Sequence, residues 1–181
     1  HILEYQCNEV LIPYWTKAAK FAADHGVTKL AIEPHGNNCV HNTETLLKLR
    51  NAVGKNIGCN FDPSHFYWQG MDPALAILEL REAIFHVHAK DCVINEHVVK
   101  RNGVLDAKPY SAFKERAWNF RTVGYGHSED EWKKIISALA TVGYDYVISV
   151  EHEDCLMTRE EGLSKCIETL KRIIIKDKVK V

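Results

Sequence analysis

Residues 83–90 read AIFHVHAK, an apolar run that ends in a histidine and a lysine. Such a run is typical of a buried β-strand, because β-branched and aromatic residues favour strands. Three more short apolar runs end in an acidic residue: LAIE at 30–33, GCNFD at 58–62 and VISVE at 147–151. The sequence therefore predicts four strands, each with a polar, metal-binding type of side chain at its C-terminal end.

Amphipathic segments separate these strands. Helices are expected at residues 8–26, 42–54, 71–82, 128–143 and 159–176. Gly26 and Gly54 can take the left-handed conformation that ends a helix, and Pro73 lies in a first turn, where its missing N–H costs little. Strands that alternate with helices in this way predict parallel strands joined by right-handed crossovers.

Four strand–helix units are half of a closed (β/α)8 barrel, which has eight strands and about 250 residues. We therefore expect an α/β fold in which residues 1–181 form half of a TIM barrel; a small open doubly wound sheet is the alternative. The strand-end side chains favour the barrel, because its strands point their C-terminal ends at one mouth. The long connection at 91–127 is expected to be a lid or a binding loop over that mouth.

The four strand-end residues are candidates for a single metal site. Glu33, Asp62 and Glu151 offer carboxylates, and His88 offers an imidazole. This set suits one divalent ion such as Mn²⁺, Zn²⁺, Co²⁺ or Mg²⁺. One strand-end carboxylate is more often a helix N-cap or a surface charge, but four such endings in succession favour a metal site and an enzyme.

Three neighbouring residues are candidates for binding a substrate. His65 follows Asp62 by three residues on what is expected to be a loop, so its imidazole could hold a substrate hydroxyl beside the metal. Lys90 follows His88 at the rim of the mouth. Trp68 is either a packing residue or a ring that stacks on a sugar. His86 faces the same side of its strand as His88, one layer deeper, and could be a hydrogen-bonded interior histidine.

Composition excludes several classes of function. The formal net charge is −1 and the sequence pI is about 6.9, so bulk attraction to nucleic acid or to an anionic membrane is not expected. The six cysteines form no CxxC pair, which favours reduced thiols in a cytoplasmic protein. No apolar run reaches membrane-spanning length, and no signal peptide is visible.

Five segments together resemble the xylose isomerase-like TIM barrel superfamily, near its sugar phosphate isomerase/epimerase group, which shares a fold with AP endonuclease family 2. They are LAIEPHGNN, NFDPSHFYWQGMDP, AIFHVHAKD, FRTVGYGH and VISVEHED. The resemblance implies that the chain is the C-terminal half of the barrel, roughly strands 5 to 8. It implies one metal on Glu33, Asp62, His88 and Glu151, with His65 on metal-bound substrate. It also implies that Glu33 and Glu151 act as acid and base on opposite faces of a sugar.

The resemblance implies a metal-dependent sugar or sugar phosphate isomerase or epimerase that removes a proton next to a carbonyl. An inosose-type or keto-sugar dehydratase is the first alternative; a non-catalytic half-barrel or an AP endonuclease-like protein is the second. Two departures matter. The epimerases' substrate-binding Arg is absent from residues 91–95, and the endonucleases' Asp-x-His pair is absent between Asp91 and Glu151.

The expected partner is a small sugar or polyol substrate, not nucleic acid or a membrane. Because the sequence opens on His1 without an initiating Met, its N-terminus is not expected to be the natural one. The rest of the barrel is then expected from a missing N-terminal half or from a second copy in a homo-oligomer.

Overall fold

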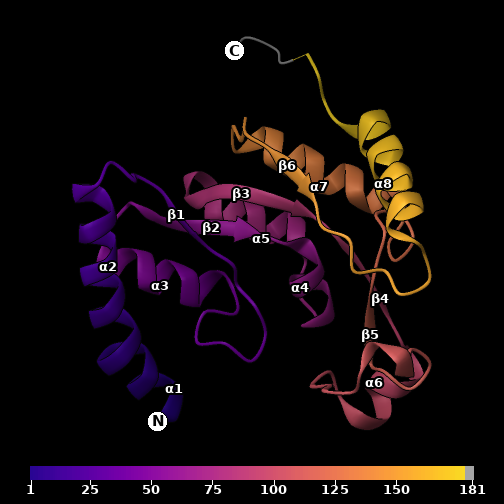
Figure 1. Cartoon of the computed structure of the whole chain (residues 1–181), viewed down its shortest axis with the longest axis horizontal. Coiled ribbons are helices and arrows are strands. Elements are labelled where there is room, and N and C mark those ends of the chain that lie inside the picture. The colour runs from indigo at the N-terminus through magenta and orange to yellow at the C-terminus, as the bar shows by residue number, and fades with distance from the viewer. Residues whose placement is uncertain (178–181) are drawn as a thin grey trace.

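The main sheet has four parallel strands. The computed structural model describes residues 1–177 and orders these strands β1-β2-β3-β6. They are β1 Leu30–Ile32, β2 Ile57–Phe61, β3 Ile84–Ala89 and β6 Ile148–Val150 (Figure 1). Their spatial order follows their order in the sequence, so the sheet lacks the reversal that defines a doubly wound fold. The parallel α/β half-barrel is thus the expectation that the structure confirms.

The helices begin and end where local chemistry favours it. The main ones are α2 Ile12–Asp24, α3 Thr43–Val53, α5 Pro73–Leu80, α7 Glu129–Thr141 and α8 Arg159–Ile173. Asn42 caps α3 by accepting the Thr45 N–H, and Ser128 caps α7 by accepting the Glu131 N–H. The first helical run starts earlier than predicted, because α1 Ile2–Tyr5 and a π-helical stretch, Gln6–Leu11, precede α2.

One hydrophobic cluster joins these helices to the sheet. It contains Leu46 from α3, Ile77 from α5 and Ile135 from α7, packed with Phe61 of β2 and Val87 of β3. Burial of such side chains supplies the main stabilisation of the fold. The opposite sheet face carries polar and partly exposed side chains, among them those of Asn60, His86, His88 and Ser149. That polar face is the inside of the half-barrel.

The connection between β3 and α7 is a folded arm, here defined as residues 91–121. It contains β4 Asp91–Ile94, α6 Glu96–Asn102, a short 3₁₀ turn at Tyr110–Ala112 and β5 Trp118–Arg121. β4 and β5 pair antiparallel, and the arm projects from the main sheet (Figure 1). The connection thus has secondary structure of its own, and its expected role as a lid or a binding loop stays a prediction. The chain leaves β3 after Lys90 and pairs with β5 instead of continuing in the barrel.

Two sets of contacts hold the arm in place. The ring of Trp68, from α4 Pro63–Trp68, stacks on Trp118 with centroids 4.6 Å apart. The fully buried carboxylate of Asp91 accepts six N–H groups, from the backbone of Cys92, Gly124, Gly126 and His127 and from the side chains of His127 and Trp132. Asp91 is therefore a structural clamp at the junction of barrel and arm.

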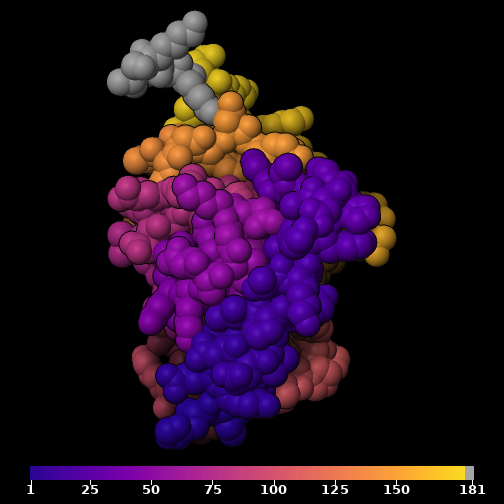
Figure 2. Space-filling view, turned by 90° about the vertical axis from the view of Figure 1, so that its left-hand side faces the viewer, coloured from indigo at the N-terminus to yellow at the C-terminus, as the bar shows by residue number. Residues whose placement is uncertain are grey.

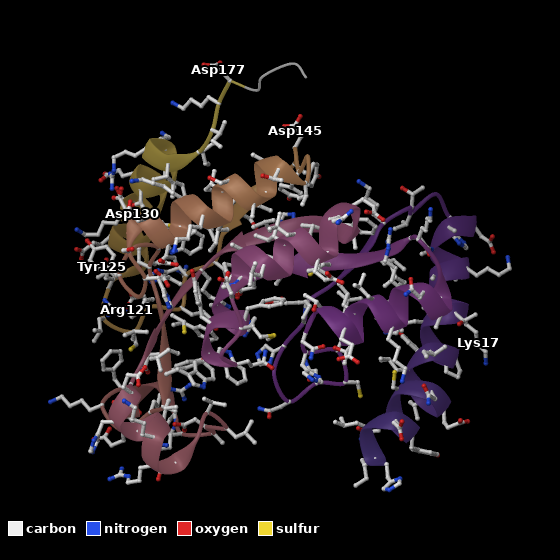
Figure 3. The ribbon with its side chains drawn as sticks, turned by 180° about the vertical axis from the view of Figure 1, so that it is seen from behind. Lys17, Arg121, Tyr125, Asp130, Asp145 and Asp177 are labelled. Carbon is white, nitrogen blue, oxygen red and sulfur yellow. The ribbon has the colours of Figure 1, made fainter. Side chains whose placement is uncertain are left out.

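The N-terminal helical run covers part of one face of the molecule (Figure 2). Figure 2 shows the N-terminal helical residues (indigo) in front of the arm. Arg121 of the arm lies close to Tyr125 (Figure 3), its guanidinium 5.9 Å from the ring centroid. Within residues 1–177, each helix is too short or too polar to span a bilayer. The predicted half-barrel extends to Val181, but residues 178–181 lie outside the described part.

Candidate metal centre

The structure brings the four expected ligands together at the C-terminal ends of the parallel strands. Glu33 follows β1, Asp62 follows β2, His88 lies near the end of β3 and Glu151 follows β6. Each offers a ligand atom, and these atoms all lie within 4.8 Å of one another. The four side chains are thus close enough to share one ion.

The two glutamates flank this group from opposite sides. They come from β1 and β6, the outer strands of the four, whereas Asp62 and His88 come from the inner pair. The side chains of Glu33 and Glu151 are 31% and 35% exposed, and that of Asp62 is fully buried. A bound molecule can therefore reach both glutamates, while Asp62 stays beneath the surface.

Three of the four residues hold a buried polar atom that has no hydrogen-bond partner among residues 1–177: Asp62 Oδ2, His88 Nδ1 and Glu151 Oε2. The last two lie 2.7 Å apart, but in directions that do not suit a hydrogen bond. Buried polar atoms are nearly always paired. Carboxylate oxygens and an imidazole nitrogen share a divalent cation as a partner, so this donor set fits one metal ion.

The side chains of the centre attract positive charge. Burial alone would raise the pKa of Glu33, but His65 and His88 hold that pKa well below its usual range. His88 and Lys90 lower the pKa of Glu151 to about 2, although burial opposes them. In return, Glu151 and Glu33 raise the pKa of His88 to about 9. The two glutamates therefore favour positive charge in the space between them.

Asp62 owes its orientation to helix α4. It is the N-cap of that helix, and its Oδ1 accepts the Ser64 N–H at 2.9 Å. This bond leaves Oδ2 toward the centre. His65 lies within α4 and not on a loop, which corrects the expectation. Its Nε2 lies 3.2 Å from Glu33 Oε1 and 3.5 Å from Asp62 Oδ2.

Of the two roles expected for Trp68, the structure favours the packing residue over a ring that stacks on a sugar. It is 2% exposed, with Trp118 stacked on its ring and the backbone of Gly36 against it. The ring therefore has no open face for a sugar. Its indole N–H donates to His65 Nδ1 at 3.2 Å. Because an indole can only donate, His65 carries its proton on Nε2, the nitrogen that faces the centre.

Lys90 is buried, not at the rim. It is 2% exposed, and its Nζ lies 3.0 Å from Asp62 Oδ2, 3.0 Å from Glu151 Oε1 and 2.8 Å from Glu153 Oε2. Burial would lower the pKa of Lys90, but these three carboxylates raise it above its usual range. Burial raises the pKa of Asp62, and Lys90 offsets part of that effect. The ammonium is therefore engaged by protein oxygens, and the substrate-binding role expected for it stays a prediction.

Two further residues belong to the surroundings of the centre. The side-chain amide nitrogen of Asn60 lies 3.2 Å from His88 Nε2, while its Oδ1 is buried with no partner in the described chain. The opposite orientation of this amide would let Oδ1 accept the Nε2–H and leave the His88 Nδ1 lone pair for a metal. His86 pairs with Ser149 Oγ at 2.7 Å, so its expected role as a hydrogen-bonded interior histidine is confirmed.

Asn60 and Glu153 are not among the residues that the sequence predicted for the site. Asn60 precedes Asp62 by two positions in the strand register, and this period of two could have placed both side chains on one sheet face. Glu153 follows Glu151 by two, but no strand continues there. Only the fold brings Glu153 to Lys90.

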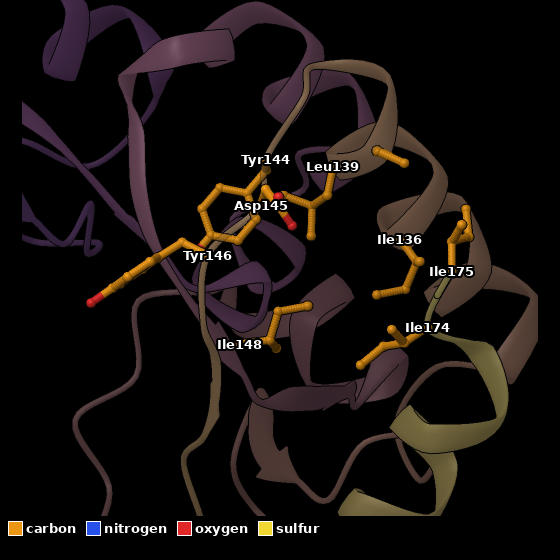
Figure 4. Close-up of a pocket in the computed structure, with 9 residues that line it drawn as sticks. Ile136, Leu139, Tyr144, Asp145, Tyr146, Ile148, Ile174 and Ile175 are labelled. Carbon is orange, nitrogen blue, oxygen red and sulfur yellow. The ribbon is translucent and has the colours of Figure 1, made fainter. Parts of the chain in front are cut away.

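An apolar cavity of about 200 Å³ lies elsewhere. Ile136, Ile148 and Ile174 converge on it (Figure 4), with Tyr144 and Tyr146 beside them. The tyrosines precede β6, whereas Glu151 follows that strand. The cavity is therefore at the opposite end of the strand from the metal-ligand group and contains none of its residues.

Comparisons with known proteins agree with this architecture. A family model described as "Xylose isomerase-like TIM barrel" matches residues 2–173. A curated relative, "Uncharacterized protein YfiH" of Bacillus subtilis (strain 168), is 44% identical over 173 residues, which are 96% of this chain and 55% of that protein. The chain therefore spans about half the length of this relative.

Solved structures show the same fold. A xylose isomerase domain protein from Planctomyces limnophilus has a TM-score of 0.63 at 20% identity, over 90% of this chain and 52% of its own. The IOLI protein, solved with a binding zinc atom, has a TM-score of 0.64 at 23% identity. The match covers 90% of this chain and 54% of the IOLI chain. The probable 3-DHS dehydratase AsbF of Bacillus anthracis, involved in petrobactin synthesis, has a TM-score of 0.66 at 18% identity. The match covers 88% of this chain and 55% of the AsbF chain. The chain belongs to the xylose isomerase-like TIM barrel family.

Proposed function

We propose that this chain carries the metal centre of an isomerase or epimerase for a small polyhydroxylated carbonyl compound, such as a sugar or sugar phosphate. The reaction moves a proton on the carbon next to the carbonyl. The observation that carries the proposal is the placement of Glu33 and Glu151, from the two outer strands, on either side of one ligand group. A proton can then be removed on one side of a bound substrate and returned on the other.

The protein groups divide this work. When bound, a divalent ion would polarise the carbonyl and stabilise the negative charge that develops on proton removal. Glu33 and Glu151 stay ionised, since their pKa values are lowered, so either can accept a proton. His65 presents its Nε2–H toward the same centre and can donate a hydrogen bond to a substrate oxygen. Asp62 and His88 serve as ligands without a proton-transfer role.

The test is exchange of solvent deuterium into substrate. The protein is incubated with Mn²⁺ in D₂O and with a panel of keto sugars, sugar phosphates and inososes, and exchange is followed by NMR. We expect exchange at the carbon beside the carbonyl. Glu151→Gln keeps the shape of the side chain but removes the proton acceptor, so exchange should slow by about 10²–10⁴-fold. Glu160→Gln, at an exposed glutamate in the first turn of α8, is the matched control and should leave the rate unchanged.

Other outcomes separate the alternatives. Loss of a hydroxyl and formation of an unsaturated product would identify a dehydratase that uses the same proton abstraction. Cleavage of abasic-site DNA without exchange into any sugar would contradict the proposal in favour of an endonuclease-like protein. Equal exchange rates in Glu151→Gln and in the unaltered chain would exclude Glu151 as the proton carrier.

The rest of the substrate pocket is also a proposal. We infer that a second half-barrel, either from the same natural protein or from another copy of this chain, completes the mouth, because the outer strands β1 and β6 have no further strand partner among residues 1–177. The mass of the 181-residue chain in solution distinguishes these two sources. A dimer supports the second copy, and a monomer that gains exchange activity only with an added N-terminal half supports the first.

A further inference from the structure

The ammonium of Lys90 is surrounded in the way a bound cation is. Three carboxylate oxygens lie within 2.8–3.0 Å of its Nζ, and they come from Asp62, Glu151 and Glu153. The ammonium donates a hydrogen bond to Glu153 Oε2 and forms ion pairs with the other two carboxylates. The ring of Phe120, 4.3 Å from Nζ, covers a further side. Lys90 is 2% exposed, so this cation is held away from water.

This position adjoins the metal-ligand group and shares two residues with it. Glu151 places Oε1 on Lys90 and Oε2 beside His88, so the ion pair fixes which oxygen faces the metal. Asp62 Oδ2, which also faces the metal-ligand group, lies 3.0 Å from Lys90 Nζ. Four carboxylates, those of Glu33, Asp62, Glu151 and Glu153, therefore face two adjacent cation positions, and Lys90 fills one of them.

We propose that Lys90 is the fixed second cation of this centre: its ammonium occupies a position formed by Asp62, Glu151 and Glu153 and limits the centre to one metal ion. The inference rests on the metal centre of the proposed function and adds its stoichiometry. Lys90 acts through the carboxylates, so it is a positioning residue. The physical reason is competition for space, because the ammonium already occupies the position among these three carboxylates that a second ion would need.

The experiment counts Mn²⁺ ions per chain. The 181-residue chain is titrated with Mn²⁺, and bound metal is measured by elemental analysis and by the electron paramagnetic resonance of the bound ions. The unaltered protein should bind one ion. Lys90→Ala removes the ammonium and opens its volume, so it should bind a second ion, and the spectrum should show two coupled Mn²⁺ ions.

Two matched variants separate charge from space. Lys90→Met removes the charge but fills much the same volume, so it should bind one ion. Lys90→Ala combined with Glu153→Gln removes one of the three carboxylates and should return the count to one. A count of one in Lys90→Ala, with normal folding, would overturn the inference while leaving the metal centre intact. A count of zero in the unaltered protein would instead contradict the proposed function.

A second comparison, between the unaltered protein and Glu153→Gln, does not depend on whether Lys90→Ala folds. The unaltered protein and Glu153→Gln both retain Lys90, so both should bind one Mn²⁺ at saturating concentration. If the unaltered protein binds two ions and Glu153→Gln binds one, then Glu153 is already a metal ligand and Lys90 does not block the second position.

Lys90→Ala can also be tested if it folds only when refolded with Mn²⁺. The bound Mn²⁺ ions are then counted in the refolded protein, and two ions per chain support the inference.

Discussion

Asp62, Glu151 and His88 each have one polar atom that contacts a neighbouring protein group and another that faces the centre. Asp62 Oδ1 accepts a hydrogen bond from the Ser64 N–H, and Glu151 Oε1 forms an ion pair with Lys90. His88 Nε2 lies within hydrogen-bond distance of the Asn60 side-chain amide. The atoms left over are Asp62 Oδ2, Glu151 Oε2 and His88 Nδ1, which lack hydrogen-bond partners in residues 1–177. The neighbours of the ligands therefore set the geometry that a metal would meet.

Asn60 gives the first prediction at this scale. Asn60→Leu keeps a side chain of similar size but cannot hydrogen-bond to His88 Nε2, so the imidazole loses the contact that fixes its orientation. We expect Mn²⁺ affinity to fall by about 10–100-fold, measured by isothermal titration calorimetry. Ser149→Ala is the control, because it breaks the hydrogen bond to His86, which is not a ligand. Equal weakening in both variants would mean that the effect comes from general loosening of the barrel interior.

At the scale of elements, the strand ends were predictable because their apolar runs and terminal polar residues lie next to each other in sequence. Helix α4 was not, because Pro63–Trp68 is only six residues long and too short for a helical period to emerge. The arm was missed for another reason. Whether Asp91–Ile94 continues the barrel or pairs with Trp118–Arg121 depends on contacts between residues far apart in the sequence.

The Asp91 clamp gives the second prediction. Asp91→Asn replaces one acceptor oxygen with an NH₂ group that faces N–H donors, so a fully buried network loses partners that it cannot replace with water. We expect the free energy of unfolding to fall by about 2–4 kcal/mol, measured by urea denaturation. Asp130→Asn, at a side chain that is 83% exposed, should change it by less than about 0.5 kcal/mol. An equally small change in Asp91→Asn would show that the clamp is not needed for stability.

At the scale of the whole molecule, the metal centre lies where all four parallel strands end. One hydrophobic cluster joins the sheet to α3, α5, α7 and α8 on its outer face. The inner face has no comparable apolar cluster among residues 1–177, and its polar side chains converge on the ligand group. An ion bound by Glu33, Asp62, His88 and Glu151 would connect β1, at one edge of the sheet, to β6 at the other.

Metal binding should therefore stabilise the folded chain as a whole. An ion that binds only the folded state adds about 2.7 kcal/mol at a free concentration 100 times its dissociation constant, so Mn²⁺ should raise the thermal midpoint and a chelator should lower it. Asp62→Ala combined with His88→Ala removes both inner-strand ligands, and its midpoint should respond to neither treatment. Differential scanning calorimetry, with elemental analysis of the same samples, makes the measurement. Retention of metal by the double variant would contradict the ligand assignment. Metal bound by the unaltered chain without any rise in its midpoint would instead mean that the unfolded chain binds the ion about as tightly as the folded one.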